Sequence, residues 1–236
     1  MAEAAGKTAK GEQTRTLILE TAVELFLERG YEETTMRAIA ERAGVALGSA
    51  YYYFRSKEQL IQAFYSRTHQ EHVAESEHVL RTERTLRGRL LGVMAAKLRT
   101  IEPYHRFSGV LFRTAADPES PLHPFSPESL PARIEATEVF AEVVRGAEDR
   151  KLPKDLEAEL PDLLWMYHMG IILFWIHDRS PGRVRTWTLM ERTVDLVSRL
   201  IAVSAFPLMG PIRKSVLRLL ADLRAPVPGE EPAPAG

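Results

Sequence analysis

The chain has 236 residues, of which 45% are hydrophobic and 27% are charged, enough for one large globular domain or two smaller ones. It contains no cysteine, which excludes disulfides, thiolate metal sites and cysteine nucleophiles. The formal net charge of −1 predicts no overall attraction to nucleic acid, so any DNA contact must depend on a local surface.

The sequence shows no targeting or membrane-spanning segment. The N-terminal stretch is small and polar and lacks the apolar centre of a signal peptide. The most apolar run, LLWMYHMGIILFWI at 163–176, contains a histidine and is shorter than the roughly 20 apolar residues that span a membrane. We therefore expect a cytoplasmic protein without membrane contact, in which this run is a helix buried in protein.

A basic arm and a helix are expected first. Residues 1–11 carry Lys7 and Lys10 among small polar residues and are expected to be disordered. Over 14–29, apolar side chains recur at helical spacing and predict one buried stripe. Gly30 then stands where a left-handed residue commonly ends a helix.

Two short helices are expected next. The pair Thr34-Thr35 offers a cap for a helix over 36–42, and Gly44 breaks it. A second short helix is expected over 47–53. The sequence SKEQ then predicts a capping box, in which Ser56 and Gln59 bond each other's backbone amides, at the start of a long helix.

The run AYYYF at 50–54 could be a buried strand or part of the second short helix. The strand has no partner strand in this chain and is flanked by helical sequence. On a helix, Ala50 and Phe54 lie four residues apart and share the buried face. The side chains away from that face or at its margin are Ser49, Tyr51, Tyr52 and Tyr53. Tyrosine hydroxyls donate to phosphates and tyrosine rings pack on thymine methyls, so the pattern predicts the recognition helix of a helix-turn-helix.

The stretch TTMRAIAERAGVALGSAYYYFRSKEQLIQAF resembles the DNA-binding region of the TetR (tetracycline-repressor) family of bacterial transcriptional regulators. The similarity runs from about residue 14 to residue 64, and its most specific pieces are IAERAGV, G-x-x-YYYF and SKEQL. The resemblance implies an all-α protein with a three-helix DNA-binding domain, assigned to 12–66, and a helical effector-binding and dimerisation domain, assigned to 67–224. It also implies a ligand-responsive repressor that binds a palindromic double-stranded DNA operator as a homodimer.

The resemblance extends to individual residues of the DNA-binding region. The positions that contact phosphates in the family are matched by Thr35, Tyr51 and Lys57. The positions that meet bases or backbone are matched by Arg37, Leu47, Gly48, Tyr52 and Tyr53. Two residues depart from the family pattern: Ala46 replaces a common serine or threonine, and Leu47 a common lysine or glutamine. Ala46 gives up a helix cap worth about 1 kcal/mol, and Leu47 can offer DNA only an apolar contact.

Beyond residue 66 the sequence reads as a series of helices without a strand pattern. Helices are expected near 85–101, 104–115, 132–149, 161–178, 186–205 and 211–223. Repeated prolines between 116 and 131 exclude a continuous helix there and predict a loop that could line a site. The tail 225–236 is expected to be disordered.

By resemblance, the two apolar helices over 161–178 and 186–206 form a four-helix interface with their symmetry mates. The first is apolar nearly all round, and the second has one apolar and one polar side. The residues expected at this interface are Leu164, His168, Ile172, Trp175, Met190, Val194, Val197 and Ile201. His168 could also anchor a ligand, or be a core histidine bonded to a carbonyl group.

The effector is expected to be a small apolar or aromatic molecule, because the candidate pocket residues include few charged groups. They are Met94, Leu98, Phe107, Leu111, Phe112, Phe125, Trp165, Met166 and Met169. Each of these residues could instead belong to the plain core. No cofactor is expected.

Two other functions fit parts of the sequence. Residues 75–78 and 102–105 both match Glu-x-x-His, the signature of carboxylate di-iron bundles, but Pro103 interrupts the second motif. No Gly-rich phosphate loop and no G-x-S-x-G motif occurs, so neither catalytic residues nor metal ligands are expected. The departures at Ala46 and Leu47 would also fit a dimer that has kept the fold and lost DNA binding.

Overall fold

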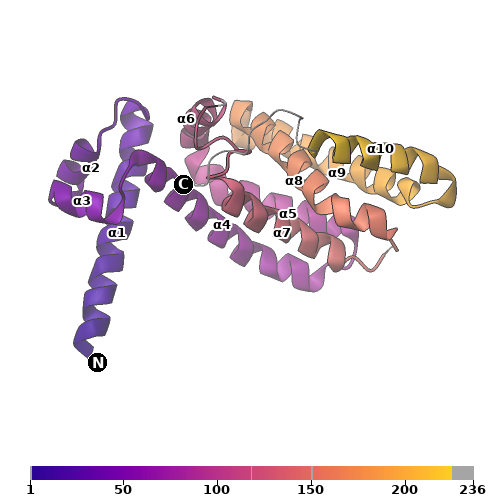
Figure 1. The fold of residues 1–236 in the computed structure, drawn as a ribbon, viewed down its shortest axis with the longest axis horizontal. Coiled ribbons are helices and arrows are strands. Elements are labelled where there is room, and N and C mark those ends of the chain that lie inside the picture. Colours follow the sequence, from indigo (N-terminus) through magenta and orange to yellow (C-terminus); the bar gives the residue numbers. More distant parts are fainter. Residues whose placement is uncertain (1, 118, 150, 225–236) are drawn as a thin grey trace.

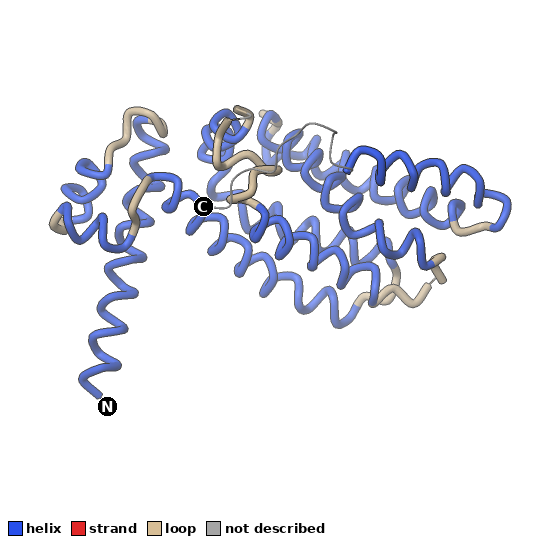
Figure 2. The backbone as a smooth tube through the Cα atoms, in the orientation of Figure 1, coloured by secondary structure: helices blue, strands red, loops and turns tan. Residues whose placement is uncertain are grey.

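The computed structural model describes residues 2–117, 119–149 and 151–224, and every regular element in these ranges is a helix (Figures 1 and 2). The α-helices are α1 (Ala2–Arg29), α2 (Met36–Ala43), α3 (Leu47–Tyr53), α4 (Lys57–Thr82), α5 (Leu86–Ile101), α6 (His105–Ala115), α7 (Leu130–Arg145), α8 (Lys154–His177), α9 (Val184–Ser204) and α10 (Gly210–Arg224). The expected all-α fold is confirmed. The tail 225–236 lies outside the described residues.

Helix α1 begins earlier than the sequence predicts. Residues 2–11, expected to be a disordered arm, form its first turns. Alanine, lysine and glutamate are strong helix formers, and in this stretch their preference offsets that of Gly6 and Gly11. The N-terminal end of α1 projects away from the other helices (Figure 1).

Helices α1, α2 and α3 and the first turns of α4 enclose one apolar core. Buried residues from all four helices meet there, among them Phe26, Ile39, Ala50 and Leu60. The stripe predicted over 14–29 is the buried side of α1, where Ile18 and Ala22 have no exposed surface. Burial of this stripe, more than helix propensity, holds the short helices α2 and α3 in place.

Helix α4 leaves this first core and runs along the remaining helices, which pack around α5 (Figure 1). Leu90, Val93 and Met94 of α5 are fully buried in a second core shared with α7, α8 and α9. A Cβ atom at Gly92 would collide with Val79 of α4, so glycine at this position allows α4 and α5 to approach closely.

Helix α6 belongs to the first core although it follows α5 in sequence. The ring of Phe107 stacks on Phe26 of α1 with centroids 5.7 Å apart, and it meets Phe64 of α4 edge-on at 4.9 Å. Leu122, from the loop that follows α6, is buried in the same core. The DNA-binding region predicted from the sequence is thus packed directly against α6.

Helix α8 also begins earlier than predicted, at Lys154 instead of 161, so Pro161 lies inside it. Proline cannot donate the backbone hydrogen bond of a helix interior, which disfavours this position. The acidic residues Asp155 and Glu157 in the first turn favour the helix, and Leu156 and Leu160 are buried. Burial of this face therefore outweighs the lost hydrogen bond.

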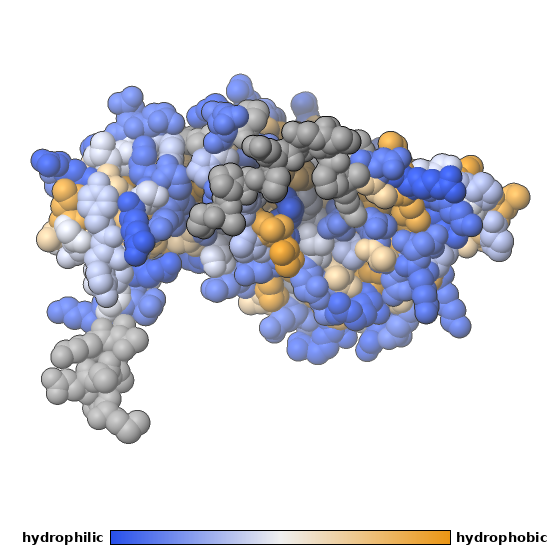
Figure 3. All heavy atoms as spheres, in the orientation of Figure 1, coloured by the Kyte–Doolittle hydropathy of each residue, from blue (hydrophilic) through white to orange (hydrophobic). Residues whose placement is uncertain are grey.

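Apolar side chains remain exposed along the last three helices, and Figure 3 shows some of them among hydrophilic neighbours over α8, α9 and α10. Within the described residues, no single helix is long and apolar enough to cross a membrane. The segments Pro181–Ser204 and Pro207–Asp222 meet the criteria of length and composition only as a pair, and the chain bends by 91° between them.

A buried arginine ties together the ends of two helices. The guanidinium group of Arg89 on α5 donates to the carbonyl oxygens of Leu80 and Glu83 at the end of α4, at 2.6 and 2.9 Å. It also donates to Glu142 and Val143 near the end of α7, at 2.7 and 3.0 Å. The last carbonyls of a helix have no partner within the helix, so Arg89 satisfies those of Leu80, Glu83 and Val143 and shares that of Glu142 with the Gly146 amide.

We expect Arg89→Met to lower the free energy of unfolding by about 3 kcal/mol, because four carbonyl oxygens each lose a hydrogen bond from the buried guanidinium group. Arg84→Met is the matched control, since Arg84 forms an exposed ion pair with Glu148 and its loss should cost under about 1 kcal/mol. Urea unfolding of both variants measures the difference. Equal midpoints for the two variants would contradict the structural role of Arg89.

Candidate DNA-binding surface and ligand cavity

A tight turn sets the angle between α2 and α3. Gly44 has φ 66° and ψ 30°, the left-handed conformation that glycine adopts without strain, and its N–H points to the carbonyl groups of Ala40 and Glu41. Thr35 caps α2, with its hydroxyl accepting from the Ala38 amide at 3.2 Å. Ala46 stands at the cap position just before α3, and its methyl group cannot form a side-chain cap. Two helices at a fixed angle result, as in a helix-turn-helix.

The predicted division of α3 into buried and exposed faces is confirmed for Ala50 and Phe54, which are buried in the first core. Tyr52 is the most exposed aromatic residue of this helix, with 81% of its surface accessible, and Tyr51 is also exposed. Tyr53 and Leu47 are partly buried against the core, which limits what they can offer to a partner. Ser49 is also half-buried.

The other residues expected to touch DNA lie around this helix. Arg37 near the start of α2 is exposed, as is Gly48. A Cβ atom built on Gly48 would meet no protein atom within 4 Å, so the fold itself does not demand glycine there. An unobstructed backbone at this position is available for close approach by a partner.

Lys57 is held by the turn between α1 and α2, a contact that the sequence did not indicate. Its ammonium group donates to the carbonyl of Tyr31 at 2.7 Å and lies 4.3 Å from the centre of that ring. The Tyr31 hydroxyl donates in turn to Glu58 at 2.6 Å, and burial, together with this carboxylate, raises the pKa of Tyr31. The start of α4 is thus fixed against the end of α1.

The capping box at this helix start differs from the prediction by one residue. The Ser56 hydroxyl accepts from the Gln59 amide at 3.4 Å, as predicted. The side chain of Gln59, however, accepts from the amide of Arg55 at 2.8 Å and not from that of Ser56. The box therefore also fixes the residue before the cap.

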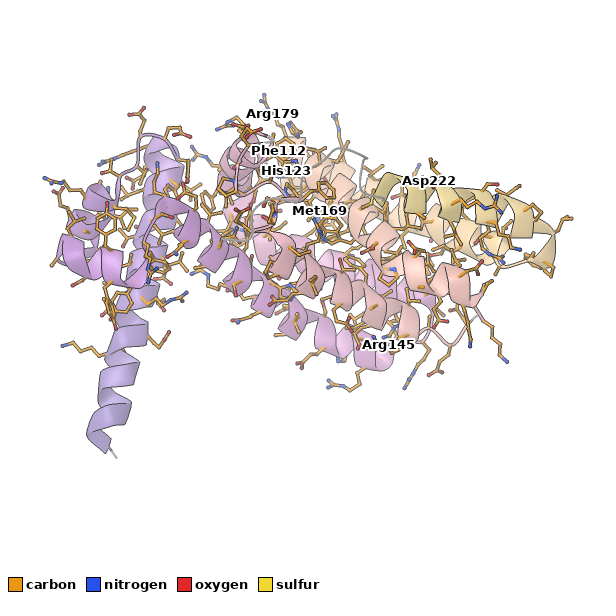
Figure 4. All side chains as sticks on the ribbon, in the orientation of Figure 1. Phe112, His123, Arg145, Met169, Arg179 and Asp222 are labelled. Atoms are coloured by element: carbon orange, nitrogen blue, oxygen red, sulfur yellow. The ribbon has the colours of Figure 1, made fainter. Side chains whose placement is uncertain are left out.

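A cavity of about 410 Å³ lies between α4, α5, α6, α7, α8 and the proline-rich loop. Its lining is mainly apolar and includes five of the predicted residues: Leu111, Phe112, Phe125, Trp165 and Met169. Figure 4 shows Phe112, His123 and Met169 grouped where α6, the loop and α8 meet. Phe125 from the loop meets Trp165 edge-on at 6.0 Å, so the loop forms part of the cavity wall.

The remaining predicted pocket residues lie elsewhere. Met94 and Leu98 of α5 are buried in the second core, and Phe107 is buried in the first. Met166 of α8 is exposed and does not border the cavity. Helical spacing places each of these apolar residues on one face of its helix. Packing against neighbouring helices decides whether that face meets the cavity, the core or solvent.

Helix α4 contributes a wall of the cavity that was not predicted from the sequence. His69 and His72 look like part of a solvated face in the sequence, yet both border the cavity and His72 is buried. The Nε2 atom of His72 lies 3.0 Å from the Val93 carbonyl oxygen, and burial lowers the pKa of His72 to about 3. His72 is therefore neutral at physiological pH and donates to that carbonyl from Nε2.

The predicted dimer interface needs correction as well. Six of its residues are buried within the chain itself and present no surface to a partner: Leu164, His168, Trp175, Met190, Val194 and Ile201. The other two, Ile172 and Val197, are half-buried and pack on the second core. The apolar stripe chosen on α9 is the side that faces this core, and other apolar side chains of α9 face outward.

Neither Glu-x-x-His motif forms a metal site. Glu75 and His78 are exposed on α4. Glu102 accepts from the indole N–H of Trp175 at 2.8 Å, and His105 Nε2 lies 2.8 Å from the carbonyl oxygen of the same residue. No group of three potential metal ligands occurs in the described part of the chain.

Comparisons with known proteins agree with this architecture. Residues 18–64 match the family described as "Bacterial regulatory proteins, tetR family", and residues 89–218 match "Tetracyclin repressor-like, C-terminal domain". The HTH-type transcriptional regulator TtgR of Pseudomonas putida is 28% identical over 202 residues, which cover 80% of this chain and 86% of that protein.

Solved structures share the fold at lower identity. The regulator FadR from Bacillus subtilis, solved in complex with stearoyl-CoA, superposes with a TM-score of 0.61 at 17% identity, covering 76% of this chain and 96% of that one. A TetR transcriptional regulator from Nitrosomonas europaea gives a TM-score of 0.59 at 21% identity, with coverage of 77% and 96%.

The two family matches place the helix-turn-helix and most of the helical region that follows it within one family. The chain belongs to the TetR family of bacterial regulatory proteins and is a DNA-binding transcriptional regulator of the ligand-responsive repressor type.

Proposed function

We propose that this protein represses transcription in the cytoplasm as a homodimer, which inserts two copies of α3 into the major grooves of a palindromic operator. The observation that supports this most is the pair of exposed tyrosines, Tyr51 and Tyr52, on a helix whose other side is anchored in the first core. Two-fold symmetry of the dimer matches a palindrome whose half-sites lie about 34 Å, one helical turn, apart. Membership of a regulator family also points away from an enzyme.

The proposed contacts fall into two groups. Tyr52, with Arg37 and the open backbone at Gly48, lies where base edges would be read, and Leu47 adds an apolar contact. Thr35, Ser49, Tyr51, Tyr53 and Lys57 are proposed to contact the phosphate backbone. Lys57 has three N–H groups and uses two on the carbonyls of Tyr31 and Glu32, so one remains for a phosphate.

Effector binding and DNA binding can be coupled through residues that both border the cavity and belong to the first core. Leu111, Ala115 and Leu122 border the cavity and are also buried in the core of the DNA-binding region. An effector that moves α6 or the loop must therefore disturb the core that supports α3. It releases the operator only if it binds the form with displaced α3 helices more tightly than the DNA-bound form.

The direct test is titration of the purified chain against DNA from upstream of its own gene, with excess random DNA and at two salt concentrations. We expect a complex that survives the competitor and weakens steeply with salt, because phosphate contacts release counterions. A confirmed dimer that forms no specific complex with any operator fragment, selected from a random library as well, would support the alternative in which DNA binding has been lost.

We expect Tyr52→Ala to weaken operator binding by about tenfold or more, because a base or phosphate contact is worth about 1–3 kcal/mol. The melting temperature should change little, since Tyr52 is 81% exposed and its ring contact is an edge-on one with Tyr53. Tyr53→Ala is the comparison, because its ring packs on the first core and its removal should also lower stability. Unchanged affinity in the Tyr52 variant would remove this residue from the DNA contacts.

The dimer is proposed to form through the exposed apolar side chains of α8 and α9, in place of the buried ones predicted from the sequence. On α9, Leu196, Leu200 and Val203 lie three and four residues apart and form one exposed stripe. On α8, Met166 and Phe174 are exposed on either side of Gly170, which has open space around its Cα atom. A small residue at the centre of an apolar helix face allows a partner helix to approach closely.

We expect Leu200→Glu to convert the dimer to monomers and to reduce operator affinity, because a carboxylate would be buried in an apolar interface. Ile134→Glu on α7 is matched in exposure, at 60% for Ile134 against 59% for Leu200, and should leave the dimer intact. Sedimentation velocity of both variants decides the point. If the Leu200→Glu variant remained a dimer, Leu200 would not lie in the dimer interface.

A further inference from the structure

The polar groups of the cavity gather where α4, α5 and α8 meet. His69 and His72 come from α4, Lys97 from α5 and His168 from α8. The rings of His69 and His72 are 6.4 Å apart between centroids, and those of His72 and His168 are 6.5 Å apart and nearly parallel. Burial lowers the pKa of all three imidazoles, and the positive charge of Lys97, which borders the same cavity, lowers each of them further.

The imidazole of His168 has no hydrogen bond in this structure although it is buried, with 4% of its surface exposed. A neutral imidazole carries one N–H donor and one lone pair that each prefer a partner, and leaving both nitrogens unsatisfied in a buried site is unfavourable. His72 differs, because Val93 accepts its N–H group. His168 borders the cavity, so its free nitrogens are available to an occupant.

Among the described residues, the wall of the cavity carries positive charge and no carboxylate. No aspartate or glutamate borders it among the described residues, whereas Lys97 and Arg133 both do. Arg133 donates to the Pro124 carbonyl at 3.1 Å and lies over the ring of Phe125, so it is occupied in holding the loop. Lys97 makes no hydrogen bond or ion pair with any described residue, and Glu71, the carboxylate that raises its pKa, lies 3.9 Å from Arg67.

We propose that the cavity binds an amphipathic monocarboxylic acid, whose carboxylate lies between Lys97 and His168 and whose apolar body lies against Phe112, Trp165 and Met169. This inference rests on the proposed function, in which an effector occupies the cavity. The ammonium and imidazole groups offer N–H donors to both oxygens of one carboxylate. The apolar walls beyond them favour a long alkyl chain or an aromatic ring.

Size and charge limit the alternatives. A volume of about 410 Å³ is near the lower end of drug-sized pockets, which run from about 300 to 1,000 Å³. It suits a single fatty or aryl-alkanoic acid better than a molecule with several phosphates. One unpaired cation also matches one negative charge, and a second anion on the ligand would stay uncompensated. The histidines are not assigned to a metal ion, because no group of three potential metal ligands occurs in the described ranges.

The test compares acids with neutral molecules of the same shape. Decanoate against decanamide, and 1-naphthylacetate against 1-naphthylacetamide, differ mainly in charge and are titrated into the full-length chain by calorimetry. We expect at least one acid to bind about tenfold or more tightly than its amide. Equal affinity of both acids and their amides, or no binding of either acid up to about 1 mM, would overturn the proposal.

Substitutions at two positions of the same helix show where the preference arises. Lys97→Met should reduce the ratio of acid to amide affinity to about one and leave the amide affinity unchanged, and Lys97→Arg should restore part of the preference. Arg99→Met is the control, since Arg99 is exposed on α5 and does not border the cavity. Loss of an unpaired, desolvated cation does not weaken folding, so melting curves should show Lys97→Met folded. A Lys97→Met variant that keeps the acid preference contradicts the assignment.

The pH dependence gives a second readout. Burial lowers the pKa of Lys97 to about 8, although Glu71 acts against this shift. The other charged or titratable groups that border the cavity are Tyr65, His69 and His72 on α4, His123 in the loop, Arg133 on α7 and His168 on α8, and Glu135 faces His69 at 3.9 Å. Lys97 is protonated below its pKa, so acid affinity should be constant near pH 7 and begin to fall as the pH rises above about 8. Amide affinity should not change, and a parallel fall for both ligands would contradict the role of Lys97.

Failure of this inference and failure of the proposed function are distinguishable. Binding of the acid measured without DNA tests the cavity alone, and the operator titration without acid tests DNA binding alone. Release of the operator by decanoate or naphthylacetate, abolished by Lys97→Met, supports both. If the acids bind with the expected preference and the operator complex persists, the carboxylate site stands and the regulatory role of the cavity is wrong.

Discussion

The packing of Phe107 is the constraint on which the rest of this structure depends. Its ring is fully buried between Phe26 of α1 and Phe64 of α4, with a stacked contact on one side and an edge-on contact on the other. Such aromatic pairs contribute beyond the area that they bury. Because close-packed interiors do not deform gradually, α6 and the first core must move together or repack as a unit.

Two helices therefore connect the cavity to the DNA-binding surface, and they border it at different ends. Helix α4 begins beside that surface, where Lys57 is held by Tyr31, and about three turns later it supplies His69 and His72 to the polar end. Helix α6 supplies Leu111 and Phe112 to the apolar wall. An amphipathic occupant would touch both helices at once, with its charged group toward α4 and its body toward α6. A ligand with one charged and one apolar end therefore suits a cavity from which two helices, α4 and α6, lead to the DNA-binding region.

The sequence predicted best those parts of the fold that short-range chemistry decides. Thr35 and Gly44 define the ends of α2 through local caps, and both act as expected. The rotation of α9 about its own axis, which decides the face that meets the core, could not be predicted in this way. Its apolar residues form two stripes, one with Met190 and Val194 facing the core and one with Leu196 and Leu200 facing outward. Periodicity identifies a stripe and does not tell which neighbouring helix covers it. The position of His72 in the cavity wall was not predicted for a related reason. Its neighbours along α4 are mostly charged and exposed, so the sequence does not indicate that this one position is buried.

Two cationic residues on α5 have different roles, one in holding helices together and one in the proposed binding of a ligand. Arg89 uses its N–H groups on four backbone carbonyls, so its charge is solvated by the protein and its role is to join helices. Lys97, about two turns further along the same helix, has no such partners among the described residues and borders the same cavity as His168, which has none either. A desolvated charge without a partner destabilises the folded chain. Sites that break a packing rule without local compensation are where function is expected. The compensation for Lys97 comes most simply from outside the chain, as the carboxylate of a ligand.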